Sequence, residues 1–518
     1  MTPLLRRCLR ELPLAVGVSV GLLIAWRWGW AFVFDGAAEG YHWDDYLGAA
    51  WMVVHRIDVG YPPFRQPLHG ALVGHLGELW GSYTDAGIFW ASVGVTALML
   101  AAGLAGRALA GAAAGGAAAA LVPMARITLT APRWSNLYPL LAGTSSLSLA
   151  FAAAAARWPS VPLSLAAGAF GGIAWGIDPR GLAFAPAAGL LVALGAARAC
   201  GWGRRVALVA AFVLPLSIGP ASVEALRLDG IDRPEPVEQL RYQRKVFLRW
   251  AINGHHDTGM AAACHDEDPR ALPSLDGFRT DCAREMAAFN FGRALPDHLP
   301  VPAPWALAGA ALCLLPRERW RLGQSAETAI FFGVGLAPLL LLCWWMPYPE
   351  RYLVQLSAAL SLIVPVGLAR ALGLWARGGR GEVAQALAMG AVAVAAWRAD
   401  PTTRAAETSV QASPHEQMRE RVAAAVRSRV GPGEPLLDCA DLRTPLRWLP
   451  HSPPSPPMLE LVDARCVAWV ADPGADGPAW LLIRDHGPPK RDDGQSLRPR
   501  EAGWTAVWRL QDVRLYRR

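Results

Sequence analysis

Charged side chains are scarce in this chain. Of its 518 residues, only 18% are Asp, Glu, Lys or Arg, whereas 53% are hydrophobic. This composition excludes an ordinary soluble enzyme and is typical of a chain that lies mostly within a membrane. Only two long stretches, 223–300 and 402–518, are clearly polar, and they predict parts outside the bilayer.

Long apolar runs fill most of the remaining sequence. A membrane-spanning helix needs about 20 mostly apolar residues, and read at that length the runs predict about eleven spans. The runs are 13–34, 87–106, 108–127, 137–156, 160–177, 181–199, 204–222, 301–316, 326–346, 352–372 and 383–399. The sequence therefore predicts a polytopic α-helical membrane protein.

Acidic residues are nearly missing from every second short connection between these runs, whereas arginine gathers there. The connections in question are 107, 157, 198–205, 317–321 and 376–381. Because cytoplasmic loops carry an excess of Arg and Lys, this segregation predicts a cytoplasmic N-terminus in the plasma (inner) membrane. The loops 35–86 and 223–300 and the tail then lie outside the cell. The same arginines account for the net charge of +7, so nucleic acid is not an expected partner.

Two further absences bear on function. No internal repeat relates the predicted spans, and the acidic residues lie in outer loops instead of at mid-membrane. Both features argue against a transporter or flippase of lipid-linked or envelope components, which is the alternative function.

His255, His256 and Asp257 are metal ligands by type, but their spacing matches no zinc pattern. A solvated polar loop is the favoured interpretation, and a divalent cation remains an open candidate cofactor.

Cysteine is also sparse, with eight residues in the chain. Four of them fall in predicted outer segments, where Cys264–Cys282 and Cys439–Cys466 are candidate disulfides if that compartment is oxidising. The spacing alone does not establish either pairing.

The first outer loop is rich in chemistry-bearing residues. Near its start it contains Trp43-Asp44-Asp45-Tyr46, and a Tyr61-Pro-Pro break follows, where the prolines end a helix. Apolar residues at helical spacing on both sides of the break predict amphipathic helices in the outer interface. Adjacent residues of a helix point about 100° apart, so one carboxylate of the pair faces a reacting centre at a time.

These motifs and their order resemble the GT-C membrane glycosyltransferases, including the protein O-mannosyltransferases and the aminoarabinose transferases. The chain has Asp44-Asp45 where the family commonly has Asp-Glu. Further similarities are the glycine-rich "GGIAWGIDPRGLAFAP" (171–186) and the Arg-Tyr pair in "PYPERYLVQLSAAL" (347–360). The resemblance spans about residues 10–400, which we expect to form the transferase domain (1–400).

The resemblance implies an inverting transfer of a sugar from a polyprenyl phosphate donor to an acceptor hydroxyl at the outer membrane face. Such chemistry needs a carboxylate to accept the hydroxyl proton and cations to stabilise the departing phosphate. Asp44 matches the family's first acidic position and is the candidate base, with Asp45 as second choice or helper. The competing role for either residue is an N-cap of the helix that begins near Tyr46.

The candidate phosphate ligands are Arg351 with the neighbouring Tyr352, and Arg180 in the turn "DPR". For Arg180 a salt bridge with Asp178, or a contact with lipid headgroups, is an equally favoured role. Pairing with Glu350 is the competing role of Arg351, for which the resemblance favours the phosphate. Trp43, Tyr46 and Tyr61 are candidate contacts to the sugar or acceptor. The partners implied are a lipid-linked donor, membrane lipids and an acceptor glycan, lipid or protein.

The tail, 401–518, matches no motif that identifies an activity. Residues 414–430 have the spacing of an amphipathic helix, and four segments bounded by Pro and Gly have the composition of short strands. They predict a small α/β soluble domain outside the membrane. The predicted strand segments are 434–442, 465–472, 479–485 and 504–518.

Overall fold

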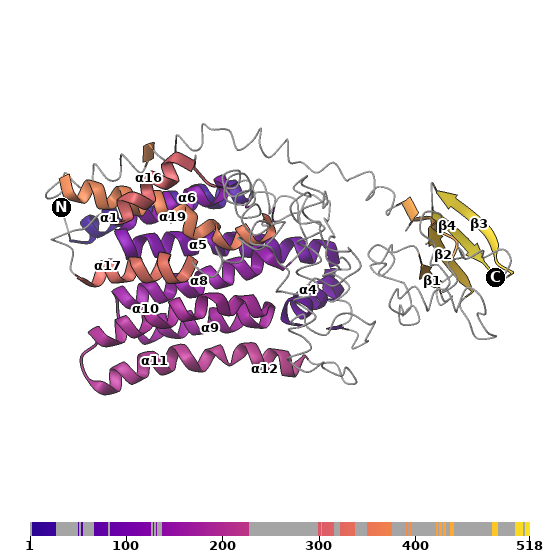
Figure 1. Cartoon of the computed structure of the whole chain (residues 1–518), viewed down its shortest axis with the longest axis horizontal. Helices are drawn as coiled ribbons and strands as arrows, with labels where there is room; N and C mark the ends of the chain where they lie inside the picture. Colours follow the sequence, from indigo (N-terminus) through magenta and orange to yellow (C-terminus); the bar gives the residue numbers. More distant parts are fainter. Residues whose placement is uncertain are drawn as a thin grey trace, which may run out of the picture. The chain divides into compact units, whose positions relative to one another are not determined.

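The computed structural model describes most of the helical part of the chain and several strands near its end (Figure 1). The described ranges are 3–26, 67–80, 83–125, 137–226, 299–301, 303–314, 322–336, 350–375, 436–439, 479–484, 503–510 and 513–518, with isolated positions at 50, 53, 54, 128, 131, 387, 390, 391 and 394 and within 421–430. They belong to two compact units. One comprises 1–38, 88–225 and 234–409, and the other 39–87, 226–233 and 410–518. The functional division predicted at residue 400 stays a prediction.

The first unit is a bundle of helices. In chain order its elements are α1 (Pro3–Ala25), α5 (Tyr83–Ala110), α6 (Ala112–Leu121), η2 (Val122–Met124), α8 (Tyr138–Arg157), α9 (Val161–Ile177), η4 (Pro179–Phe184), α10 (Ala185–Arg198), α11 (Trp202–Leu216), α12 (Ile218–Ala225), α16 (Ala303–Leu314), α17 (Leu322–Ala329), the π-helical η8 (Ile330–Val334) and α19 (Glu350–Trp375). Residues 83–87 of α5 belong to the second unit, and the rest of α5, from Ile88, belongs to the first.

Several of these helices have the length and composition of membrane spans. Among the described residues, five helical stretches are long and apolar enough to cross a bilayer: Asp85–Ala110, Tyr138–Arg157, Pro179–Arg198, Trp202–Ala225 and Val354–Leu372. Four shorter apolar helices accompany them. The total of about eleven spans stays a prediction, because the runs 326–346 and 383–399 lie partly outside the described residues.

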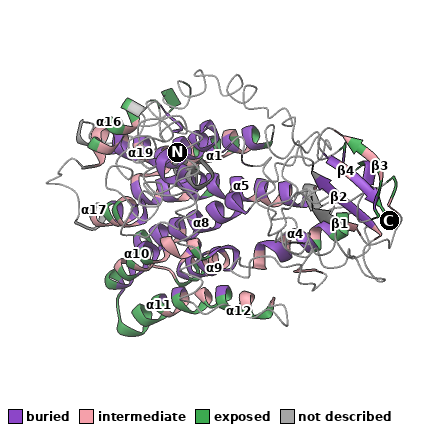
Figure 2. Cartoon of the chain, turned by 45° about the vertical axis from the view of Figure 1, so that its right-hand side comes forward, coloured by how far each residue is buried: buried purple, intermediate pink, exposed green. Residues whose placement is uncertain are grey.

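The helices of the bundle differ in burial, and α8 and α11 are the two extremes (Figure 2). All residues of α8 except Phe151 and Arg157 are buried. By contrast, α11 exposes large apolar side chains along its length, including Trp202 (79% exposed) and Leu214 (70%). A soluble protein rarely exposes such a row, whereas lipid tails accommodate it.

Small residues let the helix backbones approach closely. A side chain on Gly116 of α6 would place its Cβ 2.0 Å from the Pro13 carbonyl oxygen of α1. A Cβ on Gly168 of α9 would lie 2.1 Å from the Phe212 carbonyl oxygen of α11. The Ala- and Gly-rich composition thus serves van der Waals packing between helices, as it commonly does in membranes.

Arginine side chains at helix ends link neighbouring helices of the bundle. Arg107 at the end of α5 donates to Glu11 of α1 through Nε (2.8 Å) and Nη2 (2.7 Å), and its guanidinium lies 4.8 Å from the centre of the Trp158 ring. Arg198 at the end of α10 donates to the Ala156 carbonyl oxygen (2.7 Å). These contacts bring together the ends of α5, α8 and α10, the grouping that alternate threading requires. Which side of the membrane they occupy stays a prediction.

The second unit contains a helix of the first predicted outer loop, α4 (Pro67–Trp80), and a four-stranded sheet. The strands are β1 (Leu436–Cys439), β2 (Trp480–Arg484), β3 (Thr505–Leu510) and β4 (Val513–Arg517), in the order β1-β2-β4-β3. Strands β1 and β2 are parallel, and the other pairs are antiparallel.

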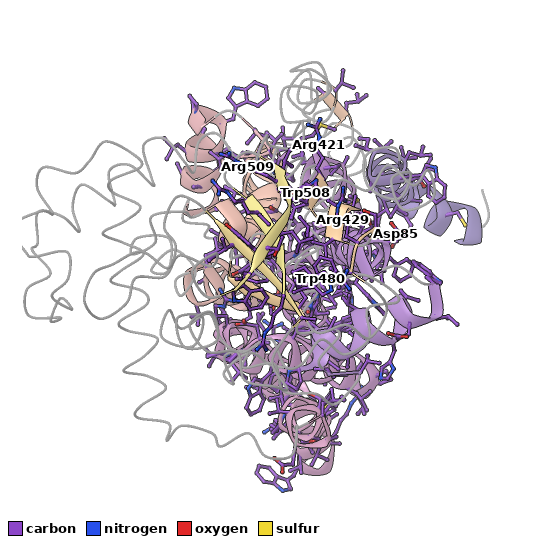
Figure 3. All side chains as sticks on the ribbon, turned by 90° about the vertical axis from the view of Figure 1, so that its right-hand side faces the viewer. Asp85, Arg421, Arg429, Trp480, Trp508 and Arg509 are labelled. Carbon is purple, nitrogen blue, oxygen red and sulfur yellow. The ribbon has the colours of Figure 1, made fainter. Side chains whose placement is uncertain are left out.

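One face of this sheet packs against the helical residues 421–426. Val422 and Val426 form a buried cluster with Trp480 and Leu482 of β2 and with residues of β4. At its margin the Arg429 guanidinium lies 5.8 Å from the centre of the Trp508 ring (Figure 3). The strands fall within three of the four predicted segments, and the fourth, 465–472, lies outside the described residues.

Candidate functional site

Most of the residues predicted to carry the chemistry lie outside the described residues. This applies to Asp44 and Asp45, to the candidate sugar contacts Trp43, Tyr46 and Tyr61, and to His255, His256 and Asp257. It also applies to Cys264, Cys282 and Cys466, while Cys439 is described only as a backbone position in β1. The roles assigned to these residues therefore stay predictions.

Arg351 and Tyr352 occupy the first turn of α19. The sequence predicts a late helix that begins with this Arg-Tyr pair, and the observed helix begins one residue earlier, at Glu350. Only the backbone of positions 351 and 352 is described. A cation in a first helical turn is near the unsatisfied N–H groups of the helix, which also favour anions.

Arg180 has its side chain fully described, at the turn between α9 and η4. Asp178 ends α9 with an extended backbone (φ −160°, ψ 141°), and Pro179 follows at the first position of η4. The Asp178 carboxylate accepts the Arg180 backbone N–H at 2.9 Å, as a helix-capping aspartate does. The local sequence Asp-Pro-Arg therefore folds the turn so that the arginine side chain returns onto the aspartate.

The Arg180 guanidinium donates two hydrogen bonds to the Asp178 carboxylate. Nε donates to Oδ1 at 2.6 Å and Nη2 donates to Oδ2 at 2.7 Å, which is the fork-to-fork geometry of a strong charge-assisted pair. The side chains are 26% and 11% exposed, so water screens the pair only in part. The salt bridge with Asp178, which was the competing role predicted for Arg180, is confirmed. The role of Arg180 as a phosphate ligand stays a prediction.

Tyr138 is a third member of this cluster, and sequence reasoning missed it. It begins α8, 42 residues before Arg180, and its hydroxyl accepts a long hydrogen bond from Nη1 (3.4 Å). The Arg180 guanidinium also lies 5.0 Å from the centre of the Tyr138 ring, within cation–π range. The available signal was the Tyr-Pro pair (138–139) at the start of the predicted span 137–156.

As observed, the cluster orients a partly exposed cation between a carboxylate and an aromatic ring. Binding a phosphate through the same fork requires the arginine to leave Asp178. Among the described residues, no group of three or more His, Cys, Asp or Glu side chains is placed to hold a metal ion.

A double-mutant cycle separates the two roles of Arg180. We expect Arg180→Gln and Asp178→Asn each to lower the free energy of unfolding, with a coupling energy of about 1–3 kcal/mol, because the two side chains are in direct contact. Thermal unfolding of the purified variants in one detergent measures it. If Arg180 also holds the donor phosphate, Asp178→Asn strengthens binding of undecaprenyl phosphate while Arg180→Gln weakens it. Coupling within error of zero contradicts the observed pair.

No family model matches the sequence, and no curated protein matches it. Solved structures are similar in fold. The oligosaccharyltransferase of Archaeoglobus fulgidus in its apo form gives a TM-score of 0.51 at 12% identity, over 93% of this chain and 70% of that chain. The same enzyme tethered with an acceptor peptide containing the NVT sequon gives 0.50, with the same identity and coverage.

ArnT from Cupriavidus metallidurans bound to undecaprenyl phosphate is also similar, with 14% identity over 97% of each chain and a TM-score of 0.47. The likeness to the oligosaccharyltransferase shows the fold of this chain. At 12% identity the likeness does not extend to the activity. The chain shares the fold of the Archaeoglobus fulgidus oligosaccharyltransferase, a membrane-helix architecture that the resemblance of its sequence motifs to the GT-C glycosyltransferases predicts.

Proposed function

We propose that this protein is an inverting glycosyltransferase that moves a sugar from a polyprenyl phosphate donor to an acceptor hydroxyl at the outer face of the membrane. The observation that carries the proposal is the joint presence of the fold shared with a solved oligosaccharyltransferase and, in the first predicted outer loop, the acidic motif "WDDY" followed by "YPP". A fold hosts many activities, so the residues of that loop supply the functional argument.

The chemistry assigns a role to each candidate. Asp44 accepts the proton of the attacking hydroxyl, and Asp45 orients the acceptor or a cation. Arg351 at the first turn of α19 stabilises the negative charge that builds on the leaving phosphate, with Tyr352 as a further ligand. A polyprenyl chain cannot leave the bilayer, so these groups must act at the membrane surface.

The direct test is donor consumption in reconstituted vesicles. The protein is supplied with radiolabelled polyprenyl phosphates that carry mannose, glucose, galactose or arabinose, with and without EDTA, and with water or an envelope extract as acceptor. We expect release of sugar-free polyprenyl phosphate from at least one donor, and none in vesicles lacking the protein. Movement of a donor between leaflets with no release from any donor supports the flippase and contradicts the transferase.

A further inference from the structure

One buried polar side chain of the bundle lacks the partners that its burial demands. Gln355 is the sixth residue of α19 and is 1% exposed, between the fully buried Val354 and Leu356. Within the described part of the chain, neither its amide oxygen nor its amide nitrogen has a hydrogen-bond partner. An amide sealed in an apolar bundle without partners destabilises the fold, so its presence calls for a reason.

Two serines that follow Gln355 on the same helix, Ser357 and Ser361, are paired. Thr128 and Ser357 share a hydrogen bond between their hydroxyl oxygens at 3.1 Å, and the Ser361 hydroxyl donates to the Ser357 carbonyl oxygen at 2.6 Å. Arg370 of the same helix donates through Nη1 to the Cys313 carbonyl oxygen. Gln355 differs from these residues because both ends of its amide are unpaired within the described part of the chain.

The position of Gln355 relates it to the proposed donor site. Residues 351 and 355 are separated by one helical turn of α19, so they lie on one face with Cβ atoms about 5–6 Å apart. In a polyprenyl phosphate sugar the sugar is attached directly to the phosphate. If position 351 provides the phosphate ligand, a side chain one turn further along the helix is at the right separation to contact the sugar.

The chemistry of the amide distinguishes the sugar from the phosphate. A phosphate oxygen offers only an acceptor and leaves the Gln355 carbonyl oxygen unpaired. Two neighbouring sugar hydroxyls offer both functions: one donates to Oε1 while the other accepts from Nε2. We propose that Gln355 is a specificity-determining residue that binds a pair of adjacent hydroxyls on the donor sugar. This inference rests on the proposed function.

The test compares donor binding with binding of the sugar-free lipid. Gln355→Met keeps the side-chain length and removes both polar atoms. We expect it to weaken binding of the polyprenyl phosphate sugar that the parent uses by about 10- to 100-fold, and to leave binding of undecaprenyl phosphate unchanged. Thermal stability of the ligand-free variant should be equal to or above that of the parent, since an unpaired buried amide is lost. Ser361→Ala, a change on the same helix in a satisfied group, is the matched control and should alter neither affinity.

Deoxygenated donors make the test independent of the variant's folding. In the parent, removal of either paired hydroxyl should weaken binding, and in Gln355→Met the same removal should have a smaller effect. Equal weakening of both lipids by the substitution, or deoxy effects of the same size in both proteins, overturns the assignment. A parent that binds no sugar-bearing donor refutes the proposed function itself, whereas a parent that binds donors through some other group refutes only the role of Gln355.

Discussion

Replacement of Asp44 by asparagine is expected to lower kcat/KM for sugar transfer by about 10²- to 10⁴-fold, the range that a positioned general base contributes. Asparagine keeps the shape and hydrogen-bonding capacity of the side chain but cannot accept the proton of the attacking hydroxyl. The loss should appear in kcat, because proton removal stabilises the transition state and adds little to ground-state binding of the donor. Single-turnover release of polyprenyl phosphate measures it.

Asp45→Asn is the matched control for this experiment. It makes the same change one residue along the chain, and its effect should be clearly smaller if Asp44 is the base. A reversal of the order assigns the base to Asp45. Full activity in both variants contradicts a catalytic role for either Asp44 or Asp45 and leaves the two residues as helix caps, for which Asn substitutes well.

The largest expected effect on stability comes from Arg198→Met. Arg198 of α10 forms an ion pair with Glu327 of α17, whose side chain is only 1% exposed. Methionine fills similar space but leaves the carboxylate without its counter-charge, in a site where the other carboxylate oxygen already has no hydrogen-bond partner among the described residues. Removal of one partner of a buried pair costs about 3–5 kcal/mol of unfolding free energy.

The companion variant Arg198→Met/Glu327→Gln provides the check. It removes the unpaired negative charge of Glu327 together with the arginine. It should therefore recover most of the lost unfolding free energy in a thermal unfolding experiment. If the single and double variants unfold at the same temperature, the loss comes from packing around Arg198 and the ion pair is not its cause.

The sequence predicted the local features of the fold well. Apolar runs located the described helices, and the Arg-Tyr pair marked the start of α19, because hydrophobic periodicity and helix ends are encoded by neighbouring residues. Strands in the tail were found from β-branched and aromatic runs between Pro and Gly, although the segment 504–518 contains two antiparallel strands, β3 and β4.

Contacts between distant segments could not be predicted. Tyr138 meets Arg180 only because α8 and α9 pack side by side, and nothing near either residue in the sequence specifies the other. Gln355 likewise looks like an ordinary polar residue of a late helix until its burial is known. The acidic pair could be identified as a candidate from its motif alone, because the family pattern is local.

The burial of α8 has a consequence for how the protein is made. A segment that the other helices shield from lipid tolerates small and polar residues, and α8 has five consecutive alanines (152–156) together with Thr144, Ser145, Ser146 and Ser148. Leu, Ile, Phe and Val are the residues that favour transfer from the translocon into the bilayer. During biosynthesis α8 should therefore partition less readily than the more hydrophobic stretch Trp202–Ala225, and its integration should depend more on the segments that leave the ribosome immediately before and after it.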